Sequence, residues 1–363
     1  MTLGDVVEQL GDGAVLALGG LVVGLAFGAL AQQSRFCLRA ATVEVSRGAL
    51  GPKLAIWLVA FGAAVVATQG LILAGLLDVS NARQLVARGS VSGALLGGAM
   101  FGAGMVLARG CASRLLVLSA TGNLRALVTG LIVTLVAQAS YRGALSPARE
   151  WLANLWMVEG GVQRSLLAPF GGSALAGVVI GLAWLIPGLW LSRRQSVGTW
   201  RSIAAIGVGL AVAGAWAVTF WIAQTSFEPV AVKSISFTGP SADTLMALIN
   251  MPSIPLSFDA GLIPGVFLGS LLAAAATREI ELQGYEGGAS MIRYIVGAML
   301  MGFGSMLAGG CAVGAGVAGG AVFAVTAWLA LVAMWAGAGI TDLLVDRGLS
   351  APALRPEGLR PSS

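Results

Sequence analysis

The sequence predicts an all-α polytopic membrane protein with about nine spans, some of them broken or re-entrant, and an inverted internal repeat. Hydrophobic residues make up 57% of the 363 residues and charged residues only 10%, whereas a soluble domain carries about 25% charged residues. The mean hydropathy is +0.88. A membrane helix needs about 20 mostly apolar residues, and stretches near that length recur along the whole chain. The composition therefore places the chain in a lipid bilayer.

Nine apolar segments account for the predicted spans, and several are so short or glycine-broken that half-helices are expected. They lie at 14–31, 54–77, 91–108, 115–138, 170–191, 202–223, 260–276, 294–308 and 318–345. The 53 glycines are about twice the ordinary share of ~7%. Many recur at four-residue spacing, as Gly20, Gly24 and Gly28 do, which allows helix backbones to approach closely in lipid.

Two stretches far apart in the chain match without gaps. Residues 97–112, "GGAMFGAGMVLARGCA", align with 297–312, "GAMLMGFGSMLAGGCA", and half of the positions are identical, Cys111 and Cys311 among them. We interpret 14–138 as repeat one, 202–345 as repeat two and 170–191 as the linking span. One linking span makes the second half cross the membrane in the opposite direction, as in many transporters that bind their substrate between the repeats.

The predicted organisation is a single transmembrane transport domain, 1–345, followed by a tail, 346–363. Basic residues in short loops mark the cytoplasmic side, and Arg35, Arg39, Arg47 and Lys53 follow the first span. The N-terminal stretch is acidic, unlike a signal peptide. We therefore expect a periplasmic N-terminus and a cytoplasmic tail. Three arginines then lie on the outer side against this rule: Arg142, Arg149 and Arg164.

All three cysteines lie at polar or glycine-flanked breaks. Cys111 and Cys311 precede apolar stretches, so both are expected near the N-terminus of a half-helix, where unpaired N–H groups and the helix dipole favour an anion. Cys37 follows the first span. Glycines beside two of them permit close backbone approach, and arginine adds positive charge. "SRFCLR" has a weaker echo in "ISFTGP", where Phe237 and Thr238 stand for Phe36 and Cys37. The candidate substrate-binding residues are Cys37, Cys111, Cys311, Gly110, Gly310 and Arg109.

The residue types also restrict the chemistry. The chain has no histidine and no CxxC pair, which argues against haem, histidine-bound zinc and a disulfide scaffold. No metal or cofactor is expected, and no basic face suggests nucleic acid. Sulfate would be served by arginine, hydroxyl and backbone donors. A thiol is a weak donor with a soft, polarizable sulfur, which suits a solute that itself presents sulfur or selenium.

The motifs "SRFCLR", "GMVLARGCASRLL" followed by "GNLRAL", and "GSMLAGGCAVG" resemble those of the YeeE/YedE family of bacterial inner-membrane thiosulfate transporters, over roughly residues 15–345. The resemblance implies a glycine-rich inverted-repeat fold and thiosulfate uptake for cysteine synthesis. It also implies that Cys37, Cys111 and Cys311 pass the ion along a central path, and that a separate TusA-like sulfurtransferase acts as partner. We expect a transporter rather than an enzyme. The alternatives are a membrane thiol–disulfide or sulfur-transfer enzyme, a selenium-compound transporter, and a scaffold subunit with packing cysteines.

Overall fold

A computed structural model describes residues 11–161, 164–226, 229–250, 252, 255–284 and 288–347. Within these ranges the chain is helical apart from its loops and one two-stranded ladder, β1 with β2. The predicted tail lies outside the described residues beyond Arg347. The elements are α2 (Asp12–Ser34), α3 (Leu38–Ser46), α4 (Pro52–Leu73), α5 (Arg83–Val86), β1 (Gly89–Ser90), α6 (Val91–Leu107), α7 (Ala112–Ala120), α8 (Leu124–Arg142), α9 (Ser146–Asn154), β2 (Met157–Val158), η2 (Ala168–Phe170), α10 (Ala174–Arg194), α11 (Thr199–Thr225), α12 (Thr238–Asn250), α13 (Phe258–Thr277), α14 (Gly288–Leu307), η3 (Ala312–Gly319), α15 (Val325–Thr341) and η4 (Asp342–Arg347).

Nine segments of the described chain are long and apolar enough to cross a membrane, which confirms the predicted fold class. The structure divides the predicted span 115–138 differently, because α7 ends at Ala120 and α8 begins at Leu124. The side chain of Asn123 caps α8 by accepting a hydrogen bond from the Ala126 N–H at 2.8 Å, a typical helix start. Residues 224–259, between the predicted spans 202–223 and 260–276, contain a helix of their own, α12.

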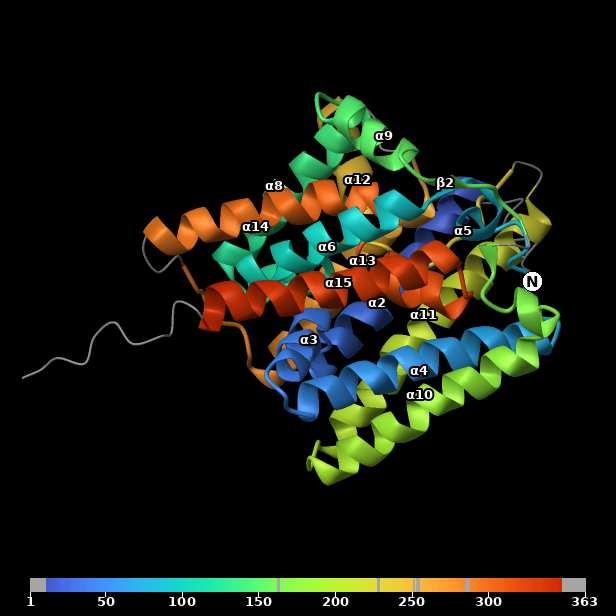
Figure 1. Ribbon diagram of the computed structural model, residues 1–363, viewed down its shortest axis with the longest axis horizontal. Coiled ribbons are helices and arrows are strands. Elements are labelled where there is room, and N and C mark those ends of the chain that lie inside the picture. The colour runs from blue at the N-terminus through green and yellow to red at the C-terminus, as the bar shows by residue number, and fades with distance from the viewer. Residues whose placement is uncertain are drawn as a thin grey trace, which may run out of the picture.

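The two halves of the molecule contain the same succession of helices. The order α2, α3, α4, α6, α7, α8 in the first half is matched by α11, α12, α13, α14, η3, α15 in the second. The linking helix α10 packs along α4, as Figure 1 also shows. The short helices α3, α7, α12 and η3 have 8 to 13 residues each, too few to span a bilayer alone.

Contacts between α6 and α14 show that the repeat is inverted. A Cβ added to Gly97 would lie 2.6 Å from the Gly304 carbonyl oxygen, and one added to Gly104 would lie 2.5 Å from the Gly297 oxygen. Residues 97 and 104 are the sequence equivalents of 297 and 304. The two contacts are thus reciprocal, and the helices run antiparallel. Reciprocal contacts between equivalent residues require a two-fold axis between the two helices. Because α6 and α14 are antiparallel, this axis is perpendicular to both helices and therefore lies in the membrane plane.

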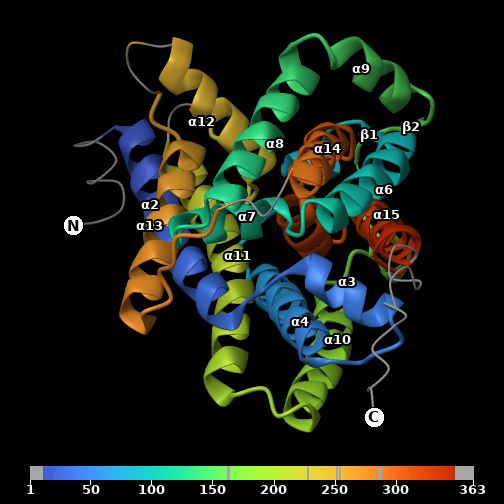
Figure 2. The same cartoon turned by 90° about the vertical axis from the view of Figure 1, so that its left-hand side faces the viewer.

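The packing of the remaining helices obeys the same two-fold relation between the repeats. Helix α2 packs on α13, while its counterpart α11 packs on α4, the counterpart of α13. Likewise α6 packs on α15, and α14 packs on α8. Figure 2 shows the molecule along its long axis, with α3 and α7 among the long helices rather than outside them. The interface between the halves is therefore the centre of the protein, and the helix breaks lie there.

Candidate functional site

Each half of the molecule interrupts a membrane-spanning segment with the same kind of helix end. After α6, Arg109 adopts a left-handed conformation with φ 54°, and the Gly110 N–H donates to the Met105 carbonyl at 3.1 Å. After α14, Gly309 has φ 80° and the Gly310 N–H donates to Ser305 at 2.8 Å. This six-to-one hydrogen bond with a left-handed residue is a Schellman motif, which ends a helix sharply.

The three cysteines are the residues that immediately precede the short helices. Cys37 occupies the N-cap position of α3, Cys111 that of α7 and Cys311 that of η3, all with extended backbone. The Cys311 sulfur accepts a hydrogen bond from the Gly314 N–H at 3.5 Å, whereas the Cys111 sulfur lies 3.4 Å from Ser113 Oγ. The first-turn N–H groups of each short helix therefore lie close to its cysteine.

The structure brings two of the cysteines together in the first half. The Cys37 and Cys111 side chains are neighbours in the buried cluster, and the Arg39 and Arg114 guanidinium groups lie within electrostatic reach of the Cys37 sulfur. Arg114 is held by a 3.2 Å hydrogen bond to Gln32 Oε1. A thiol pair with two fixed cations presents soft sulfur and positive charge at one point.

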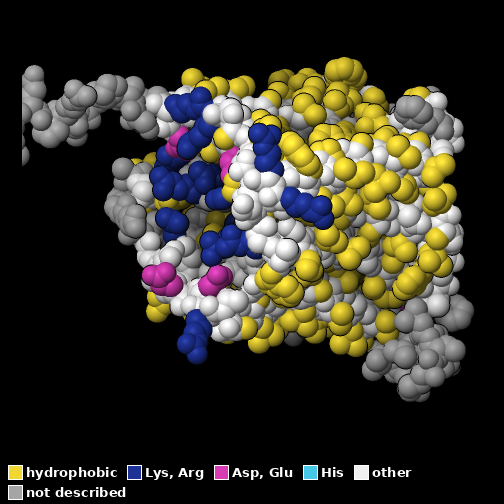
Figure 3. Space-filling model, turned by 90° about the horizontal axis from the view of Figure 1, so that it is seen from below, with side chains coloured by type: hydrophobic (Ala, Val, Ile, Leu, Met, Phe, Trp, Pro, Cys, Tyr) yellow, Lys and Arg dark blue, Asp and Glu magenta, His cyan; other side chains and the backbone are white. Residues whose placement is uncertain are grey.

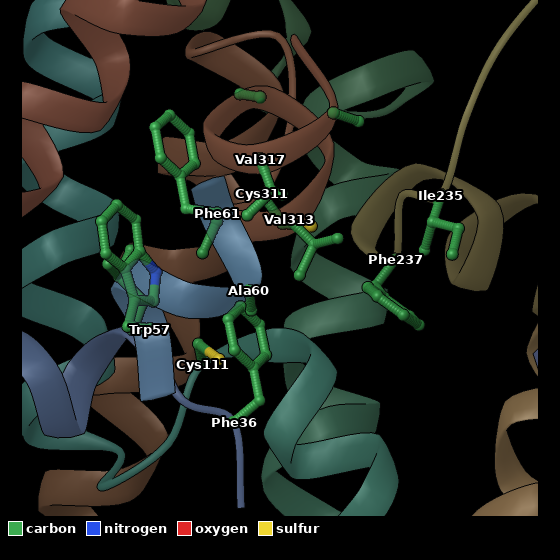
Figure 4. Close-up of a cluster of buried hydrophobic side chains, with 14 of the residues drawn as sticks. Phe36, Trp57, Ala60, Phe61, Cys111, Ile235, Phe237, Cys311, Val313 and Val317 are labelled. Carbon is green, nitrogen blue, oxygen red and sulfur yellow. The ribbon is translucent and has the colours of Figure 1, made fainter. Parts of the chain in front are cut away.

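A large cluster of buried hydrophobic side chains surrounds these sulfurs. Cys111 is 0% and Cys311 1% exposed, and both are free thiols that pack with Phe36, Phe61 and Phe237 (Figure 4). Gly310 allows its break to pack tightly, because an added Cβ would lie 2.8 Å from the Ala315 nitrogen. At Gly110 the nearest atom is a flexible leucine end at 3.2 Å, so the need for glycine is weaker there.

The second half places a hydroxyl where the first half has Cys37. Thr238 is the first residue of α12 and is 2% exposed, and its Oγ1 has no hydrogen-bond partner among the described residues. It lines a mostly apolar crevice of about 200 Å³ between α7, α8, α12 and α13. Burying a hydroxyl without a partner is costly, which makes this group a candidate donor to a solute.

The candidate residues differ in how they lie. The cysteines and both glycines are at the central breaks, but the Arg109 side chain is exposed. Arg39 and Arg114, which the sequence places beside the cysteines, are the cations that reach the thiols. Neither stands out from the sequence as more than a flanking charge, since only the tertiary structure shows which arginines turn inward. In the described part of the chain, no group of three His, Cys, Asp or Glu could hold a metal.

Comparison with known proteins gives a consistent picture. The family model for "Sulphur transport" matches residues 33–340. The thiosulfate transporter TsuA of Spirochaeta thermophila is 27% identical over 328 residues, which cover 86% of this chain and 94% of that protein. The thiosulfate transporter TsuA of Escherichia coli K12 is 25% identical over 355 residues, covering 91% of this chain and 95% of the relative.

Proposed function

The chain belongs to the sulphur transport family, and from that premise we propose that it takes up thiosulfate through a central path lined by Cys37, Cys111 and Cys311. Both named relatives are thiosulfate transporters. The observation that carries the proposal is the placement of all three thiols at helix N-caps in the buried centre where the antiparallel repeats meet.

The chemistry of the path follows from the weakness of its donors. Helix N-termini and the guanidinium groups of Arg39 and Arg114 stabilise the negative charge. The thiols contact the terminal sulfur of the ion, and each contact is worth no more than the ~1 kcal/mol of an ordinary net hydrogen bond. A series of weak sites replaces hydration without holding the ion permanently, as conduction requires. Gly110 and Gly310 support this path through their backbone at the helix breaks, and Arg109 supports it as a charged residue at the entrance.

The charge distribution supports a cytoplasmic location for one end. Figure 3 shows Lys and Arg side chains gathered at the end of the molecule where α3 and η4 lie, with few acidic side chains among them. Helix α2 begins at the opposite end (Figure 1). By the positive-inside rule, we assign this basic end to the cytoplasm of a bacterial inner membrane and the start of α2 to the periplasm. A separate TusA-like sulfurtransferase would then receive the sulfur at the basic end.

Uptake of sulfur-35 thiosulfate into proteoliposomes of the purified full chain tests the proposal. We expect time-dependent accumulation that a large excess of unlabelled thiosulfate abolishes and the same excess of sulfate reduces far less, because the thiols favour a terminal sulfur. Empty liposomes and a Cys111→Ala variant serve as controls. Equal competition by the two anions would contradict the soft-sulfur argument, and absence of uptake would contradict transport. Competition by selenosulfate tests the selenium alternative.

The proximity of Cys37 and Cys111 in the buried cluster also supports a second candidate, a membrane thiol–disulfide enzyme. Two neighbouring thiols can form a disulfide when an electron acceptor removes two electrons and two protons. Mass spectrometry of the alkylated chain before and after uptake separates the two functions. A transporter keeps both thiols reduced through many turnovers. The enzyme, without an added reductant, converts its single thiol pair into a Cys37–Cys111 disulfide as one equivalent of substrate is reduced, and then stops.

A further inference from the structure

One carboxylate at the basic end holds arginines from two different helices. Asp346 of η4 pairs with Arg293 of α14 at 2.5 Å and with Arg39 of α3 at 3.9 Å. These side chains are only 15–23% exposed. Arg39 also acts on the Cys37 sulfur and lies within electrostatic reach of Arg109. Asp346 is therefore separated from the thiol pair by a single guanidinium group.

A neighbouring carboxylate already fastens η4 to the rest of the protein. Asp342 is 0% exposed and accepts hydrogen bonds from Ser46 Oγ at 2.8 Å and from Arg47 at 2.7 Å, with Arg347 at 3.6 Å. Asp346 reaches Arg47 only at 4.0 Å. Asp342 thus anchors η4 to the end of α3, while Asp346 pairs with Arg293 and with Arg39, one of the two arginines near the Cys37 sulfur.

The same arginines retain donors that Asp346 does not use. The Nε atoms of Arg39 and Arg293 are buried and have no hydrogen-bond partner among the described residues. A hollow of about 300 Å³ is lined by Arg39, Arg47 and Lys53, so it adjoins the Arg39 side chain. Its one acidic residue, Glu44, accepts hydrogen bonds from two backbone N–H groups at the start of α4. The basic end therefore has spare cationic donors and room for a small anion.

We propose that Asp346 is a built-in counter-anion that competes with the transported ion for Arg39 and Arg293 and so speeds its release. A sulfonate group and a carboxylate offer guanidinium the same paired oxygens. Buried arginines without a competitor would hold a dianion tightly, and a path that binds too well conducts slowly. As the ion leaves the thiols, it binds to the two guanidinium groups. The Asp346 carboxylate then pairs with these groups again and displaces the ion. This inference rests on the proposed transport function.

The test measures binding and transport in the full chain. Thiosulfate binding to detergent-purified protein is titrated by calorimetry, and uptake is measured in proteoliposomes. We expect Asp346→Asn to bind about tenfold more tightly, the scale of one charge-assisted hydrogen bond, and to turn over more slowly. Asp346→Glu should stay near wild type because it keeps the charge. Glu159→Gln is the matched control, since Glu159 forms an exposed pair with Arg88.

A purely structural role predicts something different. Asp346→Asn would then lower thermal stability, as Asp342→Asn should, while binding remained unchanged or weakened; that result in a monodisperse Asp346→Asn protein overturns the proposal. Titration with sulfate separates this failure from failure of the proposed function, because arginines recognise charge and not soft sulfur. If wild type shows no thiosulfate uptake in proteoliposomes but Asp346→Asn still gains sulfate affinity, transport of thiosulfate is refuted and the counter-anion is supported. No gain for either anion refutes the counter-anion.

Discussion

Replacing Arg109 by glycine separates the backbone role of this residue from its charge. Arg109 has φ 54°, and the equivalent residue of the second half is already glycine, with φ 80°. A non-glycine residue in the left-handed region costs about 1–2 kcal/mol, and glycine loses about 0.5–1 kcal/mol more chain entropy on folding. Arg109→Gly should therefore gain roughly 0.5–1 kcal/mol in the free energy of unfolding. For a chain of this size that corresponds to a rise in melting temperature of about 1 °C.

The same substitution should weaken uptake only moderately. Because the Arg109 side chain is exposed, water and salt screen its charge, and an exposed ion pair contributes about 0–1 kcal/mol. We expect the KM for thiosulfate to rise by up to about fivefold at low ionic strength. The increase should shrink at high salt, where the Debye length falls below ~10 Å. The turnover number should change little.

Thermal denaturation in detergent and salt-dependent uptake kinetics measure both effects. Gly309→Ala is the matched control: an added Cβ there meets no atom within 4 Å, so it tests backbone strain alone and should lower stability without changing the salt dependence of uptake. A KM for Arg109→Gly equal to wild type at low salt would remove Arg109 from the binding residues. A lower melting temperature would refute the strain argument.

The other predictions concern the buried centre. Cys111→Ala and Cys311→Ala should each nearly abolish thiosulfate uptake at normal membrane expression. Serine at either position should restore little uptake, because a hydroxyl is harder and shorter than a thiol. Normal transport by the alanine variants would make these cysteines packing residues. Thr238→Val should lower uptake several-fold, roughly the value of one hydrogen bond, because it removes the buried hydroxyl. Thr238→Cys and the control Thr244→Val, which lines the same crevice, should transport well. Equal loss in both valine variants would indicate a packing effect. Variants that retain only Cys111 or only Cys311 should react with an impermeant thiol reagent from opposite sides of the membrane, with protection by thiosulfate, since the repeats are antiparallel; labelling of both from one side would contradict a path between them.

The sequence alone determined the membrane class, the number of spans and the repeat. These properties depend on local composition, because a bilayer requires long apolar segments whatever packs beside them. The Leu-Ala-x-Gly-Cys-Ala match between 107–112 and 307–312 likewise needed no coordinates. The glycine-flanked cysteine boxes also predicted the helix breaks, although the left-handed residue of the Schellman motif is a glycine, Gly309, only in the second half and Arg109 in the first. Helix α12 was missed because its proline and polar residues are typical of a loop.

Only the tertiary structure decided which side chains meet. Cys37 and Cys111 are 74 positions apart by number, and their contact depends on how α3 and α7 fold back between the long helices. The same holds for Arg39 and Arg114, which turn toward the thiols, and for Arg109, which stays at the surface. A guanidinium beside a cysteine in sequence can point to either side of a helix break. The packing of the opposite repeat determines that direction, and no local pattern encodes it.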